Sequence, residues 1–331
     1  MLKFVFTCGD INGIGPEIVV KSLNKITVRN SSSKFFFLCP SNILDVTFSN
    51  INPSFDYEII KKSKDDFSYQ VSILDLGKVK LRAGIPTKLS GETAYKALYE
   101  SFKIVDSGVA NAVITAPVSK TALKMAGVDF PGQTEMFANW TRSSNYVMTF
   151  LSHQMNAALY SIHNPLKKVA NLLNPIKLRN TLNVIIQTLE NDLGLAEFKI
   201  AVLGLNPHAG ENGMIGSEEK VLIQPVIKQY AKFIDVQGPF SPDAFFANKS
   251  YKNYDMILGM YHDQILIPFK MINFGKGVNY TAGLPIVRTS PDHGVAYDIV
   301  EKYVADESSM IQAYKYASRI VKNRKKRIAT H

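Results

Sequence analysis

Three of the six histidines follow apolar segments that are typical of buried strands: His163 after NAALYSI, His208 in GLNPHAG and His262 in GMYHDQ. Ligands of open α/β sheets bind beyond the carboxyl ends of the strands. Neutral imidazoles suit Zn, Co, Fe or Mn, and three of them leave positions for substrate oxygens. Such a metal polarises a hydroxyl or carbonyl group. The spacings of 45 and 54 residues match no local zinc motif, and a single histidine of this kind is more often a core or surface residue.

A second set of polar residues follows His262 in the segment PFKMINFGKGVNYTAGLPIVRTS. Lys270 and Arg288 provide positive charge for a phosphate, and Asn279 adds a neutral donor. The glycines between them allow a ligand to approach the backbone closely. The alternative is a solvated loop with scattered charges.

Two further segments have the composition of ligand-binding turns. In FPGQTEMFANW, Thr134 can cap a helix while its hydroxyl faces a ligand, or serve only as a cap, and Gln133 precedes it. In SPDHGVAYDIV, His293 and Gly294 form a turn that opens a helix, which suits an anion or a nucleotide. The alternative for His293 is an ordinary residue at a helix start.

The N-terminal segment GDINGIGPE does not predict a Rossmann dinucleotide site. Gly9, Gly13 and Gly15 do not have the spacing of that fingerprint, and no acidic residue ends the next strand. We expect a tight turn from a strand into a helix that begins near Pro16.

The elements that must position these residues alternate between strand and helix, which predicts an α/β fold with a largely parallel sheet. A chain of 331 residues with no low-complexity linker is consistent with two domains between which the backbone crosses more than once. Strands are expected at 4–8, 34–40, 71–76, 111–117, 146–151, 156–163, 199–207 and 256–260, and helices at 90–108 (N-cap Ser90), 177–194 (C-cap Gly194) and 217–233 (broken near Pro225).

Composition excludes several classes of protein. No apolar run is long enough for a membrane span or a signal peptide, and Cys8 and Cys39 alone suggest a reducing, cytoplasmic location without disulfides. The net charge of +10 owes much to a basic C-terminal segment, expected to be a solvated, frayed helix. No nucleic-acid-binding motif accompanies it. The basic residues of this segment are Arg319, Lys322, Arg324, Lys325, Lys326 and Arg327.

The motifs together resemble the 4-hydroxythreonine-4-phosphate dehydrogenase family of pyridoxal phosphate biosynthesis. Blocks similar to those of the family, in the family's order, run from residue 9 to about residue 300: GDINGIGPEI, APVSKTAL, AGVDFPGQTEMFA, LNPHAGENGMIGSEE, GPFSPDAFF, MYHDQILIPFK and GVNYTAGLPIVRTSPDHGVA.

The resemblance implies a two-domain α/β/α fold like that of isocitrate and isopropylmalate dehydrogenases, whose NAD site is not of the Rossmann type. We expect one discontinuous α/β domain over residues 1–128 and 284–331. A second domain over 129–283 would carry the dimer interface, with the active site in the cleft between the domains.

The resemblance also implies roles for individual residues. A divalent metal (Zn, Co, Mg or Mn) would be held by His163, His208 and His262, one of them from the neighbouring subunit of a homodimer. Substrate contacts fall on Gln133, Thr134, Lys270, Asn279 and Arg288, with Lys270 also a candidate proton acceptor. His293 and Gly294 would contact NAD or NADP.

The implied reaction is NAD- and metal-dependent oxidation of 4-phosphohydroxy-L-threonine. The product is a β-keto acid that loses CO₂ to give 3-amino-2-oxopropyl phosphate. One departure from the family pattern keeps alternatives open, because Gln133 stands where the family commonly has His, and glutamine cannot carry a proton. The alternatives are a dehydrogenase for another phosphorylated hydroxy acid, such as threonate 4-phosphate, and a non-catalytic metabolite-binding protein.

Overall fold

The computed structural model describes residues 1–29, 32–63 and 68–330 of the chain and divides it into two compact units. Unit 1 comprises residues 1–142 and 284–321, and unit 2 comprises residues 143–283 and 322–331. No helix within the described ranges is both long and apolar enough to span a membrane.

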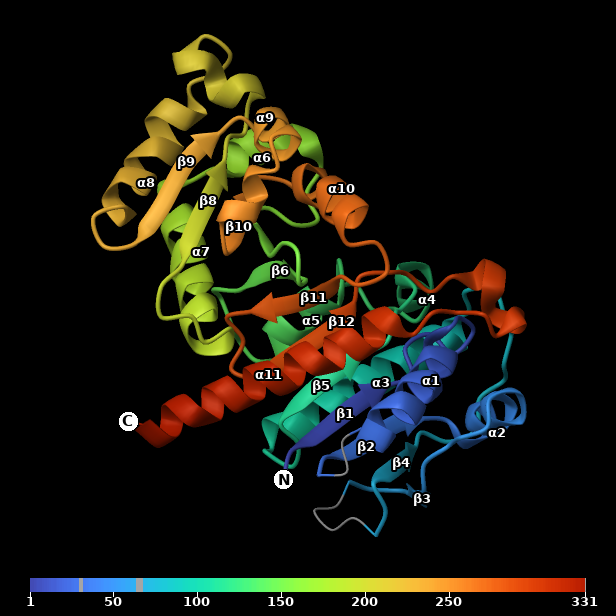
Figure 1. The fold of residues 1–331 in the computed structure, drawn as a ribbon. Coiled ribbons are helices and arrows are strands. Elements are labelled where there is room, and N and C mark those ends of the chain that lie inside the picture. Colours follow the sequence, from blue (N-terminus) through green and yellow to red (C-terminus); the bar gives the residue numbers. More distant parts are fainter. Residues whose placement is uncertain (30–31, 64–67, 331) are drawn as a thin grey trace. The chain divides into compact units, whose positions relative to one another are not determined.

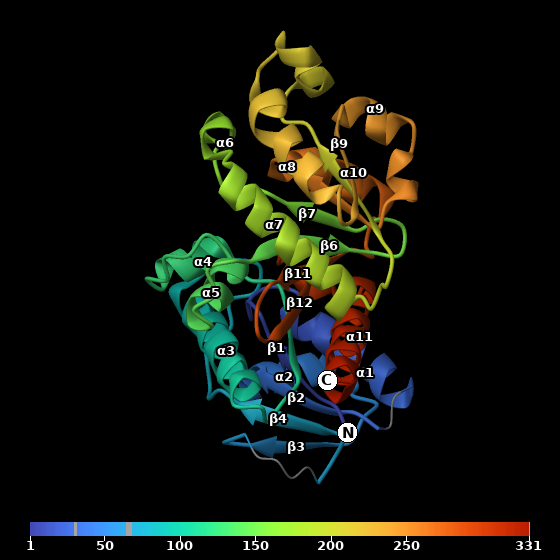
Figure 2. The ribbon, with the colours of Figure 1, turned by 90° about the vertical axis from the view of Figure 1, so that its left-hand side faces the viewer.

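Unit 1 is built on a parallel sheet in the order β3-β4-β2-β1-β5-β12, and Figure 2 shows β1, β2, β4 and β3 in succession. The strands are β1 (Lys3–Thr7), β2 (Lys34–Cys39), β3 (Tyr57–Ile60), β4 (Val71–Asp75), β5 (Ala112–Thr115) and β12 (Val287–Pro291). The helices are α1 (Gly15–Arg29), α2 (Ser41–Asn50), α3 (Lys88–Asp106), α4 (Lys120–Met125), α5 (Gln133–Trp140) and α11 (Ser308–Thr330), with a 3₁₀ turn, η5, at Tyr297–Lys302.

The core of unit 1 joins the two ends of the chain. Phe4 of β1 and Phe35 of β2 are neighbours in the sheet, and both rings contact Tyr314 of α11 at centroid distances of 5.0 and 5.7 Å. Figure 1 accordingly shows the first segment (blue) and the last helix (red) of this unit side by side. Aromatic contacts of this kind add to the burial of apolar area.

Unit 2 is built on a mixed sheet in the order β11-β6-β7-β10-β8-β9, antiparallel at β11-β6-β7 and parallel from β7 to β9. The strands are β6 (Val147–Leu151), β7 (Ala157–Leu159), β8 (Lys199–Leu203), β9 (Asp235–Phe240), β10 (Met256–Gly259) and β11 (Val278–Ala282). The helices are α6 (Leu166–Leu172), α7 (Pro175–Gln187), α8 (Gln224–Tyr230), α9 (Pro242–Ala247) and α10 (His262–Ile272). The π-helical turns η1 (Thr188–Asp192) and η3 (Glu219–Ile223) and the 3₁₀ turns η2 (Pro207–Gly213) and η4 (Ser250–Asn253) complete it.

Several local predictions are corrected. Helix α3 is capped by Thr87, with Ser90 as the reciprocal partner three residues later. The strand expected at 156–163 ends at Leu159, and that expected at 199–207 ends at Leu203. Near Pro225, where a kink or a break is expected, the helix changes from the π turn η3 to α8 at Gln224 while its backbone stays helical.

The two units differ from the expected domains at residues 129–142 and 322–331. Helix α5 groups with unit 1 because Trp140 packs on Tyr95, Tyr99 and Phe102 of α3. The last turns of α11 group with unit 2 because Arg324 binds Asp192 there.

The expectation of a frayed, solvated C-terminal helix is wrong at Arg324. Its guanidinium donates to Asp192 at 2.6 Å and to the Tyr280 hydroxyl at 2.9 Å, and Tyr280 in turn donates to Asp192 at 2.5 Å. The Asp192 side chain is 5% exposed, so its charge depends on these partners.

Replacing Arg324 by Met is therefore expected to lower the free energy of unfolding by about 3–5 kcal/mol, because it leaves a buried carboxylate without its cation. Urea denaturation measures this change. Lys325→Met is the matched control, an exposed neighbour whose loss is expected to change stability by less than ~0.5 kcal/mol. Equal stability of the two variants would contradict a structural role for Arg324.

Candidate active site

In unit 2, His163 and His262 lie close together beyond the ends of β7 and β10. Their ring centroids are 6.4 Å apart. Strands β7 and β10 are parallel neighbours, so the segments that follow them leave the sheet at the same edge. His262 is the first residue of α10, and its Nδ1 contacts the Asp263 carboxylate at 2.6 Å, which leaves Nε2 for a ligand.

His208 is presented by an unusual backbone. It follows β8 in η2, and the five residues from His208 to Asn212 all have positive φ, between 41° and 79°. Four of them are not glycine, so strain of about 1–3 kcal/mol for each must be held by the surrounding structure. The Ser241 hydroxyl lowers the pKa of Asp243 and His208 adds to that effect, which places His208 near α9.

The three histidines do not form a single cluster within one chain. Across the described residues, no group of three or more His, Cys, Asp or Glu side chains is arranged to hold a metal ion. The His163–His262 pair is close to the spacing of two ligands on one ion, but wider. Imidazole nitrogens bind zinc at about 2.0–2.1 Å, so two rings on one tetrahedral ion have centres roughly 5 Å apart. The centres here are 6.4 Å apart, so binding one ion requires the two rings to turn toward each other.

Lys270 and Asn279 lie elsewhere in unit 2. Lys270 is exposed on α10, in the same helix as His262. Eight residues of helix correspond to roughly 12 Å along its axis. Asn279 is half-buried in β11, opposite Phe150 of β6.

In unit 1, Arg288 is buried at the second position of β12, with 2% of its surface exposed. It donates to the Thr115 hydroxyl at 2.8 Å and to Gln133 Oε1 at 2.8 Å, and it lies over the ring of Phe137. Burial lowers the pKa of Arg288 to about 9, and the Glu135 carboxylate opposes this change. The guanidinium therefore keeps its charge at neutral pH.

Gln133 and Thr134 form the first turn of α5, whose N-cap is Gly132. The expectation that Thr134 caps this helix is wrong. Thr134 is the second residue of the helix, after the cap, and is buried with 1% of its surface exposed. Gln133 accepts from Arg288 and donates to the Ala116 carbonyl at 3.3 Å. A neutral amide suits this position because a protonated imidazole would face the guanidinium.

His293 and Gly294 lie in a loop of unit 1, and the helix expected to begin there does not form. The next ordered turn is η5, and α11 begins only at Ser308. His293 Nε2 is buried without a hydrogen-bond partner, and nothing lies within 4 Å of the position of a Cβ on Gly294. An orphaned ring nitrogen beside open backbone fits a ligand contact.

The GDINGIGPE turn holds this loop in place. Ile14 donates its backbone N–H to the Val295 carbonyl at 3.0 Å, and Tyr297 donates to the buried Asp10 carboxylate at 2.8 Å. Burial raises the pKa of Asp10. The tight strand-to-helix turn predicted from the sequence is confirmed, with Gly9 in the left-handed region (φ 65°).

Beside this turn, unit 1 has a pocket of about 240 Å³. Gly13 and Glu17 line one side, and Val300 and Tyr303 line another. Glu17 is 3% exposed, and its Oε2 has no hydrogen-bond partner.

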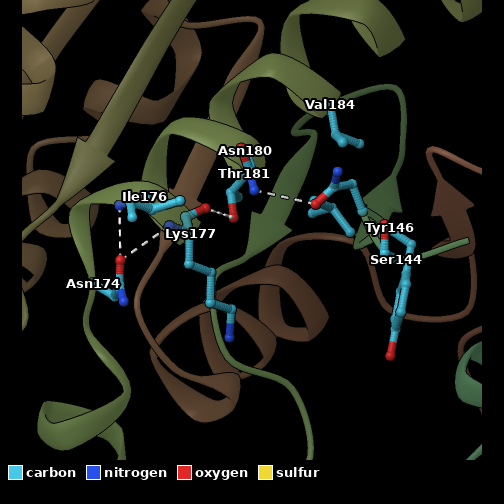
Figure 3. A pocket seen from close by; sticks show the side chains of 10 residues that line it. Ser144, Tyr146, Asn174, Ile176, Lys177, Asn180, Thr181 and Val184 are labelled. Carbon is cyan, nitrogen blue, oxygen red and sulfur yellow. Dashed lines mark hydrogen bonds between the residues drawn. The ribbon is translucent and has the colours of Figure 1, made fainter.

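A second pocket, of about 230 Å³, lies in unit 2 between α7 and residues 144–147 (Figure 3). Asn145 and Asn180 are hydrogen-bonded across it at 3.2 Å, and the Lys177 ammonium lies 4.6 Å from the centre of the Tyr160 ring. Burial lowers the pKa of Lys177. No residue predicted for the active site lines this pocket.

Three side chains that sequence reasoning did not single out support the predicted residues. Thr115 holds Arg288, whereas Gln264 and Glu219 bind the backbone around the histidines. Glu219 lies near the start of the helix that the sequence predicts at 217–233. In the sequence, only the proximity of Glu219 to His208 within LNPHAGENGMIGSEE could have indicated a role beside the histidines.

Comparison with known proteins identifies the family. Residues 31–317 match the model of the pyridoxal phosphate biosynthetic protein PdxA. The chain belongs to the PdxA family. The fold expectation is also confirmed: an isocitrate dehydrogenase from Methylococcus capsulatus, 12% identical, matches over 100% of this chain and 89% of its own with a TM-score of 0.51.

PdxA relatives with two different names match to a similar extent. A 4-hydroxythreonine-4-phosphate dehydrogenase from Desulforapulum autotrophicum is 38% identical and is matched over 94% of this chain and 93% of its own. A D-threonate 4-phosphate dehydrogenase from Salmonella typhimurium is 35% identical over 95% and 97%. The crystal structure of a 4-hydroxythreonine-4-phosphate dehydrogenase from Klebsiella pneumoniae matches with a TM-score of 0.82 and 33% identity, over 97% of this chain and 100% of that one. The chain is thus a PdxA-family oxidoreductase, and its substrate needs separate argument.

Proposed function

We propose that this protein oxidises a phosphorylated hydroxy acid with NAD or NADP and a divalent metal, and that 4-phosphohydroxy-L-threonine is the substrate. The observation that carries this proposal is the His163–His262 pair, because two solvent-accessible imidazoles with ring centres 6.4 Å apart beyond neighbouring strand ends are placed to approach one metal ion. Membership of a dehydrogenase family supports it.

His163 and His262 would provide two ligands from one chain, and His208 of a second copy would provide the third. The lack of a three-residue metal cluster among the described residues supports this assignment. When bound, the metal would act as a Lewis acid that lowers the pKa of the substrate hydroxyl. Asp263 would orient the His262 ring through Nδ1.

Exposed apolar side chains on α10 and just after it support the homodimer. Ile267, Met271 and Phe274 are 58%, 80% and 90% exposed, and the first two are one helical turn apart. A contiguous apolar surface on a helix that begins with a proposed ligand is typical of an interface.

Substrate recognition would divide between charged and neutral groups. Arg288 would bind the phosphate with a planar fork that Gln133 and Thr115 hold in orientation. Lys270 and Asn279 would add a point charge and an amide donor, and Thr134 a hydroxyl. Lys270 is also our candidate for the group that accepts the hydroxyl proton.

His293 and Gly294 would contact the adenosine part of the cofactor. The support is the unpartnered Nε2 of His293, the open backbone at Gly294 and the adjoining pocket. The nicotinamide supplies the hydride acceptor. The resulting β-keto acid would lose CO₂ and leave 3-amino-2-oxopropyl phosphate.

A substrate panel tests this assignment. We expect NADH formation with 4-phosphohydroxythreonine, its loss on addition of a chelator, and a kcat/KM at least ~10-fold lower with D-threonate 4-phosphate. The two substrates differ in the group beside the carboxylate, which is an amino group in one and a hydroxyl in the other. A metal or a polar residue can distinguish these groups, and a tenfold ratio corresponds to about 1.4 kcal/mol.

The reverse preference would assign the chain to the threonate 4-phosphate enzymes. Metal and substrate binding without NADH formation from any member of the panel would instead favour the non-catalytic alternative. Gln133→His adds a control, since it restores the residue common in the family and should leave the preferred substrate unchanged if Gln133 only holds Arg288.

A further inference from the structure

The segments that carry the three candidate ligands are joined to one another by hydrogen bonds within unit 2. Beside His163, the Ser161 hydroxyl donates to the Met260 carbonyl at 2.8 Å, and the Tyr160 N–H donates to the Gly259 carbonyl at 2.9 Å. Both acceptors directly precede the segment of His262. These two bonds hold the chain segments that carry His163 and His262 beside each other.

Gln264 extends this connection to the third segment. Its side chain is buried, with 7% of the residue exposed, two positions after His262 in α10. Its amide oxygen accepts from the Met260 N–H at 2.6 Å, and its amide nitrogen donates to the Gly204 carbonyl at 2.7 Å. Gly204 begins the loop that leads to His208. One side chain thus bonds the backbone of two ligand-bearing segments.

Glu219 holds the next two residues of that loop. Its Oε1 accepts from the N–H groups of Leu205 and Asn206, both at 2.7 Å, and its Oε2 accepts from the Asn206 side chain at 2.9 Å. Glu219 is 4% exposed. Directly after this clamp begins the left-handed run from His208 to Asn212. A strained run persists only where its ends are fixed, and Glu219 and Gln264 fix the end that leads to His208.

We propose that Gln264 is a positioning residue of the metal sites. It holds the His262 segment for one site and, in the same chain, the loop that presents His208 to the other site of the dimer, with Glu219 as its partner on that loop. This inference rests on the proposed function. Glutamine is required because the position needs an acceptor and a donor on one short, uncharged group. Outer partners of this kind typically change metal affinity 10–100-fold when mutated.

The test is Gln264→Glu, which keeps the shape and the acceptor but loses the donor to Gly204. We expect the Kd for Zn²⁺ or Co²⁺, measured by calorimetry on the metal-free dimer, to rise about 10–100-fold. The absorption spectrum of bound Co²⁺ should change as well, and excess metal should recover most of the activity. Glu219→Gln, a milder change, should move the Kd in the same direction by a smaller factor.

Asn273→Asp is the matched control. Asn273 is a buried amide at the other end of α10, 4% exposed, and donates to the Phe269 carbonyl at 3.0 Å. The same exchange of amide for carboxylate there should lower the thermal midpoint comparably while the Kd for the metal stays within about twofold, because it lies far from the histidines along the helix.

Wild-type metal affinity and Co²⁺ spectrum in Gln264→Glu, with a thermal midpoint lowered as in Asn273→Asp, would overturn the inference and leave the proposed function intact. An unmodified protein that binds neither Zn²⁺ nor Co²⁺ would overturn the proposed function and this inference together. The two failures are therefore distinguishable in one set of titrations.

Discussion

Activity is expected to return when two inactive variants, His208→Ala and His262→Ala, are combined in one dimer. Each variant alone should lose essentially all dehydrogenase activity and bound metal, because every site lacks a ligand. In a mixed dimer, one site receives His163 and His262 from one chain and His208 from the other. A 1:1 mixture with random subunit exchange should recover about a quarter of wild-type activity, since half of the dimers carry one intact site of two.

The pair His163→Ala and His262→Ala is the control for this experiment. In the unmodified chain the ring centroids of His163 and His262 are 6.4 Å apart, so both residues would serve the same site. Every site in a mixed dimer would then lack one ligand, and no activity should return. Recovery in this pair, or none in the first, would contradict the assignment of His208 to the second copy.

Replacing Arg288 by Lys should raise KM for the phosphorylated substrate about 30–100-fold, which corresponds to roughly 2–3 kcal/mol, with a smaller effect on kcat. Lysine keeps the charge but cannot donate to Thr115 and Gln133 while it binds a phosphate with a planar fork. Alanine is a poorer test because it leaves both of those partners unpaired in a buried place. Steady-state kinetics with the phosphorylated substrate and with its unphosphorylated counterpart measures the effect.

Two comparisons isolate the role of the phosphate. The unphosphorylated substrate should show nearly the same KM with both enzymes. Thr115→Val, which loosens Arg288 without removing it, should raise KM by a smaller factor. A KM within about threefold of wild type in Arg288→Lys, together with reduced stability, would show that this 2%-exposed residue acts on α5 instead of on substrate.

Much of the order of strands could be predicted from sequence because strands leave local apolar patterns, but β3, β9, β11 and β12 lie outside the expected strands. Apolar runs bounded by turn residues marked the strands, and the motif series identified the family and the isocitrate dehydrogenase-like fold. Some of the errors lie where several cap residues compete. Thr87 caps α3 in place of Ser90, and Gly132 precedes α5 in place of Thr134. Several nearby residues can satisfy the first N–H groups of a helix, and only the tertiary path of the chain selects one.

The basic C-terminal segment shows the same limit at longer range. A run of Lys and Arg predicts a solvated surface, and nothing in the neighbouring sequence sets Arg324 apart from the other five basic residues of this segment. Arg324 is different because Asp192 and Tyr280, 132 and 44 residues away in the chain, meet it in unit 2. No spacing rule relates residues that are so distant in sequence.

The sequence by itself determined the family, the fold and the residue types of the candidate site, because these follow from motif order and from the chemistry of individual side chains. The tertiary structure decided how those residues are held. It placed His163 beside His262, turned His208 away through a left-handed run, and buried Arg288 against Gln133. It also gave Gln264 and Glu219 a role, because hydrogen bonds between distant segments depend on where strand ends meet, and a one-dimensional pattern does not contain that information.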